Sequence, residues 1–159
     1  MDRNQLDETI STCLQELYDQ DGQILAQDIG ERAICGRLAM LMGPKFPAYS
    51  VDIEYNRKGP GHEPKDIEMP DENGALTTNR VFPDIIVHER GHNLRNLLVV
   101  EVKKSTNPVG DEYDLAKLQA LCGQLRYQNG LFLRLSTGPN SHLASVQRQW
   151  VEGPVIGEF

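Results

Sequence analysis

Residues 81–105 read VFPDIIVHERGHNLRNLLVVEVKKS, and this stretch decides the expected fold. Two apolar runs rich in β-branched residues flank a polar segment that contains Gly91, a pattern typical of a β-hairpin. If the turn is symmetric about His92 and Asn93, Asp84 lies directly opposite Glu101. The apolar residues of the two runs pair with one another in the same register. The sequence therefore predicts two carboxylates that face each other on neighbouring strands.

The opposed carboxylates indicate a metal site. Directly opposed residues have Cβ atoms about 4.5–5.5 Å apart, a separation at which like charges repel. Side chains alternate between the faces of a strand, so Lys103 lies on the same face as Glu101. Glu101 interrupts an apolar run, and buried carboxylates almost always have a partner. We expect Asp84 and Glu101 to bind Mg²⁺, with Mn²⁺ as a substitute, because hard cations prefer oxygen ligands. The alternative is a shifted register that exposes both carboxylates at a sheet edge.

This arrangement resembles the catalytic signature of the PD-(D/E)XK nuclease superfamily, which has the restriction-endonuclease-like fold. Residues 83–84 match the PD element, and residues 101–103 match the ExK element. The superfamily usually carries a glutamate on a helix before the first core strand, and Glu31 in QDIGERAICGRLAMLM fits that place. The resemblance covers residues 27–136, about two thirds of the chain.

The resemblance implies a role for each of these residues. Asp84 and Glu101 would bind the metal, Glu31 would bind it directly or through water, and the backbone carbonyl of Val102 would be a further ligand. Lys103 would orient the attacking water and stabilise the charge that builds up on the phosphorane. Water bound to such a metal is acidic enough to supply hydroxide near neutral pH.

Some of these residues also have a purely structural explanation. Glu31 follows Asp28 at the spacing of a capping box, in which it bonds the N-cap amide, although it also lies along the apolar stripe of its helix. Lys103 could pair with one of the two carboxylates. Lys117, on the helix after the ExK strand, and Arg57, at the end of the first core strand, are candidates for substrate binding. A solvated surface is the alternative for Lys117.

The pattern of apolar residues predicts elements in the order α-α-β-β-β-α-β. We expect helices over residues 4–18, 29–42 and 110–122, and strands over residues 50–57, both arms of the hairpin and residues 130–136. A long polar loop is expected over residues 56–79, and residues 145–151 form either a strand or a helix. This order predicts an α/β fold with a restriction-endonuclease-like core, in which helices flank a central mixed sheet. The whole chain, 1–159, forms one domain, with residues 1–22 as an N-terminal helical extension.

Composition is that of an ordinary globular domain. The chain has 159 residues, of which 39% are hydrophobic and 25% charged, and it has no apolar run long enough for a membrane span. Its three cysteines lack metal-ligand spacing, and we expect them to be reduced in a cytoplasmic protein. The net charge of −7 is unusual for a nucleic-acid enzyme. However, residues 1–77 carry 7 basic and 15 acidic side chains, whereas residues 78–150 carry 9 basic and 6 acidic ones.

The predicted activity is therefore Mg²⁺-dependent hydrolysis of phosphodiester bonds in nucleic acid, DNA before RNA, by an endo- or exonuclease. A homodimer or a protein partner would compensate for the acidic surface, and no membrane partner is expected. One alternative is a catalytically inactive member of the fold that binds nucleic acid or assembles a complex. Another alternative is an acidic protein that mimics nucleic acid, but that function would not explain the two opposed carboxylates of the hairpin.

Overall fold

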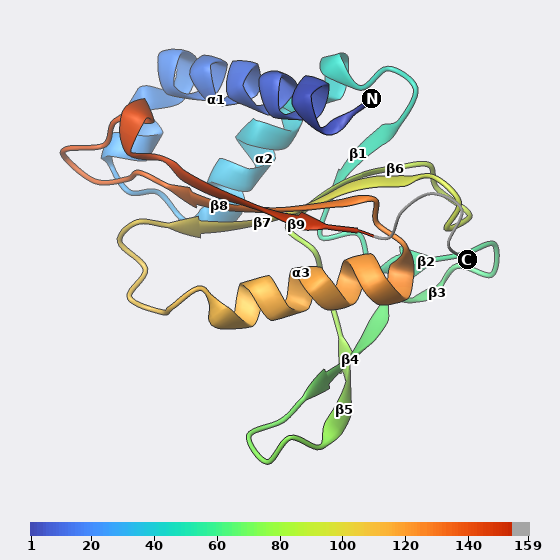
Figure 1. Ribbon diagram of the computed structural model, residues 1–159. Helices are drawn as coiled ribbons and strands as arrows, with labels where there is room; N and C mark the ends of the chain where they lie inside the picture. The colour runs from blue at the N-terminus through green and yellow to red at the C-terminus, as the bar shows by residue number, and fades with distance from the viewer. Residues whose placement is uncertain (154–159) are drawn as a thin grey trace.

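The structure, a computed structural model, describes residues 1–153, and its centre is a mixed five-stranded sheet (Figure 1). The strand order is β1-β6-β7-β8-β9, in which only β7 and β8 are parallel. The bounds of these strands are β1 Ser50–Ile53, β6 Ile85–His88, β7 Asn96–Lys104, β8 Asn129–Leu135 and β9 Gln147–Glu152. The parallel pair requires a crossover, and the helix α3 (Glu112–Leu125) supplies it.

Helices cover both faces of the sheet. The helices α1 (Arg3–Ala26) and α2 (Glu31–Met42) lie on one face, and α3 lies on the other (Figure 1). Alternate residues of β6 point to opposite sides, so Ile85 packs in the core under α1 and α2 while Ile86 packs in the core under α3. The predicted α/β architecture, a mixed sheet flanked by helices, is confirmed. None of the helices within residues 1–153 is long and apolar enough to cross a membrane.

The hairpin has the predicted register near the carboxylates. Ile85 pairs with Val100, and Ile86 pairs with Val99, as the symmetric turn requires. A bulge follows Val87, so His88 lies opposite Asn96 and not opposite the residue after it. The symmetric register is therefore correct at the Asp84 end of the hairpin and wrong at the turn end.

Two predicted helix ends are wrong. The first helix continues past residue 18 to Ala26, through a kink at Asp21 whose φ is −119°. The Asp21-Gly22 pair, a common turn signal, therefore bends the helix and does not end it. The third helix runs to Leu125 and ends where Arg126 adopts a left-handed φ of 61°. Gly123, the residue just past the expected end at 122, lies inside that helix. Two short 3₁₀ helices, Gly43–Lys45 and Leu143–Ser145, complete the helical content of residues 1–153.

The polar stretch over residues 56–79 is not a loop. It folds into two small antiparallel hairpins, formed by β2 (Arg57–Lys58) with β3 (Glu63–Pro64) and by β4 (Asp66–Pro70) with β5 (Leu76–Arg80). The second hairpin projects from the body of the molecule beside α3 (Figure 1).

Contacts with α3 hold this second hairpin in place. Gln124 accepts a hydrogen bond from the Glu68 amide at 2.8 Å and donates one to the Glu68 carbonyl at 2.9 Å. Ile67 and Met69 are buried in the core on the α3 side of the sheet. Strands of two to five residues show too short a period to be recognised in the sequence, which explains the wrong prediction. The undecided segment at residues 145–151 lies mostly in the edge strand β9.

Candidate functional site

Asp84 and Glu101 are in contact on neighbouring strands. Asp84 directly precedes β6, and its Oδ2 accepts a hydrogen bond from the Val102 amide at 2.8 Å. The Asp84 carboxylate also interacts with the Glu101 side chain, and this interaction lowers the pKa of Asp84 against the effect of burial. Glu101 lies in the middle of β7 with only 4% of its surface exposed. The structure thus brings together the two carboxylates that the sequence predicts to face each other.

Burial and mutual repulsion make this pair hold a proton. Burial, with a contribution from the Asp84 charge, raises the pKa of Glu101 to about 8, and nearby Lys117 opposes that rise. Burial also raises the pKa of Asp84, against the hydrogen bond from the Val102 amide. Two carboxylates this close repel each other when both are ionised, and the Lys117 ammonium offsets only part of that repulsion. A cation that binds Asp84 and Glu101 would therefore compete with a proton for these carboxylates.

The ammonium beside the carboxylate pair belongs to Lys117. Its Nζ lies 2.9 Å from Glu101 Oε1, at ion-pair distance but without hydrogen-bond geometry, so this buried oxygen keeps an unused acceptor position. Lys103 lies on the face of β7 that was predicted, yet its ammonium points to the start of α3. There it donates to the Gly110 carbonyl at 2.9 Å and pairs with Asp114.

Glu31 lies at the first position of α2. Its Oε1 accepts hydrogen bonds from the Lys104 amide at 3.2 Å and from the Asn107 side chain at 3.0 Å. The capping-box explanation is wrong, because the N-cap residue is Gly30 and Asp28 has a left-handed φ of 56°. Glu31 therefore connects α2 to the end of β7, on which Glu101 lies.

Glu31 and Asp84 both line a cleft. The cleft has about 520 Å³ of space, part of which is open to solvent. Glu54 lines the same cleft and pairs with Arg32 at 3.2 Å on its rim. Cys35 also lines it, and burial raises the pKa of its thiol. The charges of Asp84, Glu101, Glu31 and Glu54 add to that rise. The cleft therefore has a negative potential and favours a positively charged occupant.

The carboxylate pair has the donors for a hard divalent cation. Among residues 1–153 no group of three or more His, Cys, Asp or Glu side chains is arranged to hold a metal ion. The available set is the Asp84 and Glu101 carboxylates with the Val102 carbonyl, all oxygen donors. Mg²⁺ usually keeps several waters and is held by one or two carboxylates, so this set fits it. The unused acceptor position of Glu101 Oε1 agrees with that fit.

Arg57 is not part of this cleft. The first core strand ends at Ile53 and not at residue 57, so Arg57 lies on β2 and lines a second pocket. Its Nη1 donates to the Asn56 carbonyl at 2.8 Å. The predicted site residues thus separate: Lys117 lies at the carboxylate pair, and Arg57 lies elsewhere.

Sequence reasoning missed the other polar residues around the site. Cys35 follows Glu31 by four residues on α2, and Asp114 precedes Lys117 by three residues on α3. Both spacings place the side chains on one helix face and were visible in the sequence. Buried Lys65, in the second pocket, had no such signal, because the surrounding stretch has no periodicity.

The buried ion pair between Lys103 and Asp114 predicts a measurable change in stability. Lys103→Met leaves Asp114 uncompensated, and removing one partner of a buried pair costs about 3–5 kcal/mol of unfolding free energy. Adding Asp114→Leu to the same protein should recover most of that loss. Urea denaturation of the two variants measures the effect, and a loss below about 1 kcal/mol in Lys103→Met would contradict the pair.

Comparisons with known proteins add little to the geometry. No protein-family model matches the chain, and no curated protein matches it. Among solved structures, the chain is similar to the crystal structure of SSO0001, with a TM-score of 0.42 and 14% sequence identity. The similarity covers 92% of this chain and 66% of SSO0001, so the chain spans less than two thirds of that protein's length.

Proposed function

We propose that the protein is a metal-dependent nuclease of the PD-(D/E)XK type, with a restriction-endonuclease-like core, that hydrolyses phosphodiester bonds in DNA. The observation that carries the proposal is the contact between Asp84 and Glu101 on neighbouring strands. A sheet gains nothing in stability from a buried and a half-buried carboxylate in contact, so a ligand explains Glu101 and Asp84 better than folding does.

Residues of the cleft and of the carboxylate pair would have different roles in such a reaction. Asp84 and Glu101, with the Val102 carbonyl, would hold Mg²⁺, which when bound makes water more acidic and offsets negative charge on the phosphate. Glu31, which shares the cleft with Asp84, would position the attacking water. Lys117, beside Glu101, would donate to a non-bridging phosphate oxygen and stabilise the charge that develops there.

Lys103 and Lys117 differ in whether their ammonium groups are available to donate to the phosphate. The resemblance assigns it to Lys103, whose ammonium already has a carboxylate and a carbonyl as partners. Among residues 1–153, the ion-pair partner of the Lys117 ammonium is Glu101, whose carboxylate a bound metal would also engage. The local contacts therefore favour Lys117.

Cleavage of a labelled substrate panel tests the proposal. The panel holds duplex, single-stranded and branched DNA together with RNA, in Mg²⁺, Mn²⁺ or EDTA, and compares wild type with Glu101→Ala. Cutting that requires metal and disappears in the variant supports the nuclease and identifies its substrate. The proposal fails if no substrate is cut in either metal, or if the variant cuts as fast as wild type.

A non-catalytic module of the same fold is the second candidate. The observation in its favour is that Lys103 and Lys117 both form ion pairs within the protein, so the site is partly neutralised without a metal. In that case Mg²⁺ would not raise the melting temperature, because only a ligand that binds the native state stabilises it.

The proton on the carboxylate pair predicts a pH-dependent stability. The pKa of Glu101 rises from 4.5 to about 8 on folding, so between these values the native state binds more protons than the unfolded state. The unfolding free energy therefore falls as the pH rises through this window. We expect a fall of about 3–4 kcal/mol between pH 5 and pH 8 that Glu101→Gln lacks. Urea denaturation of both proteins measures it, and equal pH profiles would contradict the shift.

A further inference from the structure

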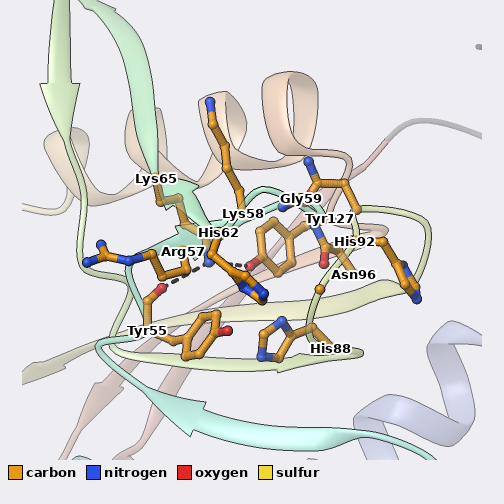
Figure 2. A pocket seen from close by; sticks show the side chains of 12 residues that line it. Tyr55, Arg57, Lys58, Gly59, His62, Lys65, His88, His92, Asn96 and Tyr127 are labelled. Atoms are coloured by element: carbon orange, nitrogen blue, oxygen red, sulfur yellow. Dashed lines mark hydrogen bonds between the residues drawn. The ribbon is translucent and has the colours of Figure 1, made fainter.

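The second pocket is lined by basic side chains. It lies at the turn end of the β6–β7 hairpin, has about 230 Å³ of space that includes open solvent, and is lined among others by Arg57, His62, Lys65 and His88 (Figure 2). Among the described residues that line it, none is acidic. In a chain with a net charge of −7, a pocket of this composition requires an explanation.

Lys65 is the central group of this pocket. Its side chain is buried, with 2% of the residue exposed, and the ammonium donates to the Tyr55 carbonyl at 2.9 Å and to the Tyr127 hydroxyl at 3.1 Å (Figure 2). Within residues 1–153 it has no carboxylate at ion-pair distance. A buried ammonium without an anionic partner costs stability, and its third hydrogen has no acceptor among these residues.

The neighbouring acidic groups are engaged elsewhere. Asp52 accepts hydrogen bonds from His88 at 2.7 Å and from Arg90 at 2.9 Å. Glu89 pairs with Arg95 at 2.7 Å. The positive charge of Lys65 is therefore left for a ligand from outside the chain.

The residues around Lys65 hold it in position and leave other donors free. Asn56 donates to the Lys65 carbonyl at 3.0 Å, which fixes the backbone at the start of the β4–β5 hairpin. His62 has a left-handed φ of 51° in the turn between β2 and β3, a strained conformation of the kind found at binding sites. The side chains of Lys58 and His62 make no hydrogen bond or ion pair with any described residue.

We propose that this pocket binds a phosphate group. Lysine, arginine and histidine donors without competing carboxylates are the chemistry that selects a phosphate anion. The inner part of the pocket has room for about one water molecule, which is also the size of a single phosphate oxygen. One oxygen of the phosphate enters this inner part and accepts from Lys65, and the remaining oxygens stay at the mouth near Arg57 and His62.

The source of this phosphate rests on the proposed function. If that function holds, the phosphate group belongs to the backbone of the nucleic-acid substrate. Strand β6 leads from the carboxylate pair to this pocket, and His88 lies four residues after Asp84. At about 3.3 Å per residue the two sites are about 13 Å apart along the strand. A phosphate a few nucleotides from the scissile bond would bind here and anchor the substrate.

Titration calorimetry with inorganic phosphate in EDTA tests the proposal independently of cleavage. Wild type should bind phosphate, and Lys65→Met should bind at least about tenfold more weakly, the loss expected for a hydrogen bond to a charged group. Arg37→Gln, on α2 at the opposite face, is the matched control and should bind like wild type. Should Lys65→Met fail to fold, the double variant Arg57→Gln/His62→Gln replaces it, with the same expected loss.

Absence of phosphate binding by wild type, or equal binding by wild type and the pocket variants, would overturn the proposal. Repeating the titration with a single-stranded oligonucleotide in EDTA identifies the source of the phosphate. Weaker oligonucleotide binding in Lys65→Met assigns the nucleic-acid backbone. Loss of inorganic phosphate binding alone assigns a small free phosphate ligand. EDTA prevents metal-dependent cleavage, so the titration reports binding alone. Its result can therefore be interpreted even if the nuclease proposal fails.

Discussion

Asp84→Asn will lose at least about a thousandfold in the rate of metal-dependent cleavage while remaining folded. The substitution removes one of two carboxylates that hold the metal, and the charge stabilisation supplied by such a metal amounts to several kcal/mol. The asparagine oxygen keeps an acceptor for the Val102 amide, whose hydrogen bond with Asp84 measures 2.8 Å, so the hairpin should stay intact. Single-turnover cleavage at saturating Mg²⁺ measures the loss, and circular dichroism monitors the fold.

The matched control for this variant is Glu89→Gln, which neutralises an exposed carboxylate of the same hairpin. It should cleave at the wild-type rate. A second readout is the melting temperature, which Mg²⁺ should raise in wild type and leave unchanged in Asp84→Asn. Cleavage by Asp84→Asn within tenfold of wild type would remove this residue from the site.

Lys117→Met will lower the cleavage rate constant by about 10²–10³-fold, the loss typical of one donor to a developing negative charge. Its ammonium lies 2.9 Å from Glu101, next to the carboxylate pair, where the phosphate would bind. Lys103→Met should lose much less in rate, because Asp114 and the Gly110 carbonyl hold its ammonium at the start of α3. Comparing the rate constants of the two variants at saturating substrate decides between the lysines.

Lys117→Arg is the informative companion, because it keeps the charge in a different shape. Partial recovery of the rate would indicate that the positive charge acts on the substrate, whereas a purely structural role for Lys117 would show as lost stability with an unchanged rate constant. The Lys103→Met/Asp114→Leu double variant should be stable. If that double variant is inactive while Lys117→Met remains active, the role of stabilising charge on the phosphate belongs to Lys103.

Much of the fold could be predicted because long apolar strands have few ways to pair. The register around Ile85 and Val100 follows from the alternation of residues across the hairpin, since a shift by one residue would move every side chain of the strand to the opposite face of the sheet. The contact between Asp84 and Glu101 follows from that register. The bulge after Val87 could not be predicted, because Gly91 allows several turn geometries.

Side-chain partners across elements could not be predicted. Lys103 pairs with Asp114, and Lys117 pairs with Glu101, because of the way α3 lies over β7. The sequences of the two elements do not determine that placement. The small hairpins over residues 57–80 were missed for a similar reason. Their strands are held by contacts such as the one between Gln124 and Glu68 and not by their own periodicity.

Binding of Mn²⁺ to the folded protein tests most directly the claim that Asp84 and Glu101 form a metal site. Calorimetric titration of wild type at pH 8, where Glu101 gives up its proton most readily, should show Mn²⁺ bound at this site with the release of protons. Glu101→Gln should lose that binding while remaining folded, which circular dichroism in the absence of metal checks. Equal Mn²⁺ binding by wild type and Glu101→Gln, or no binding by wild type, would contradict the account.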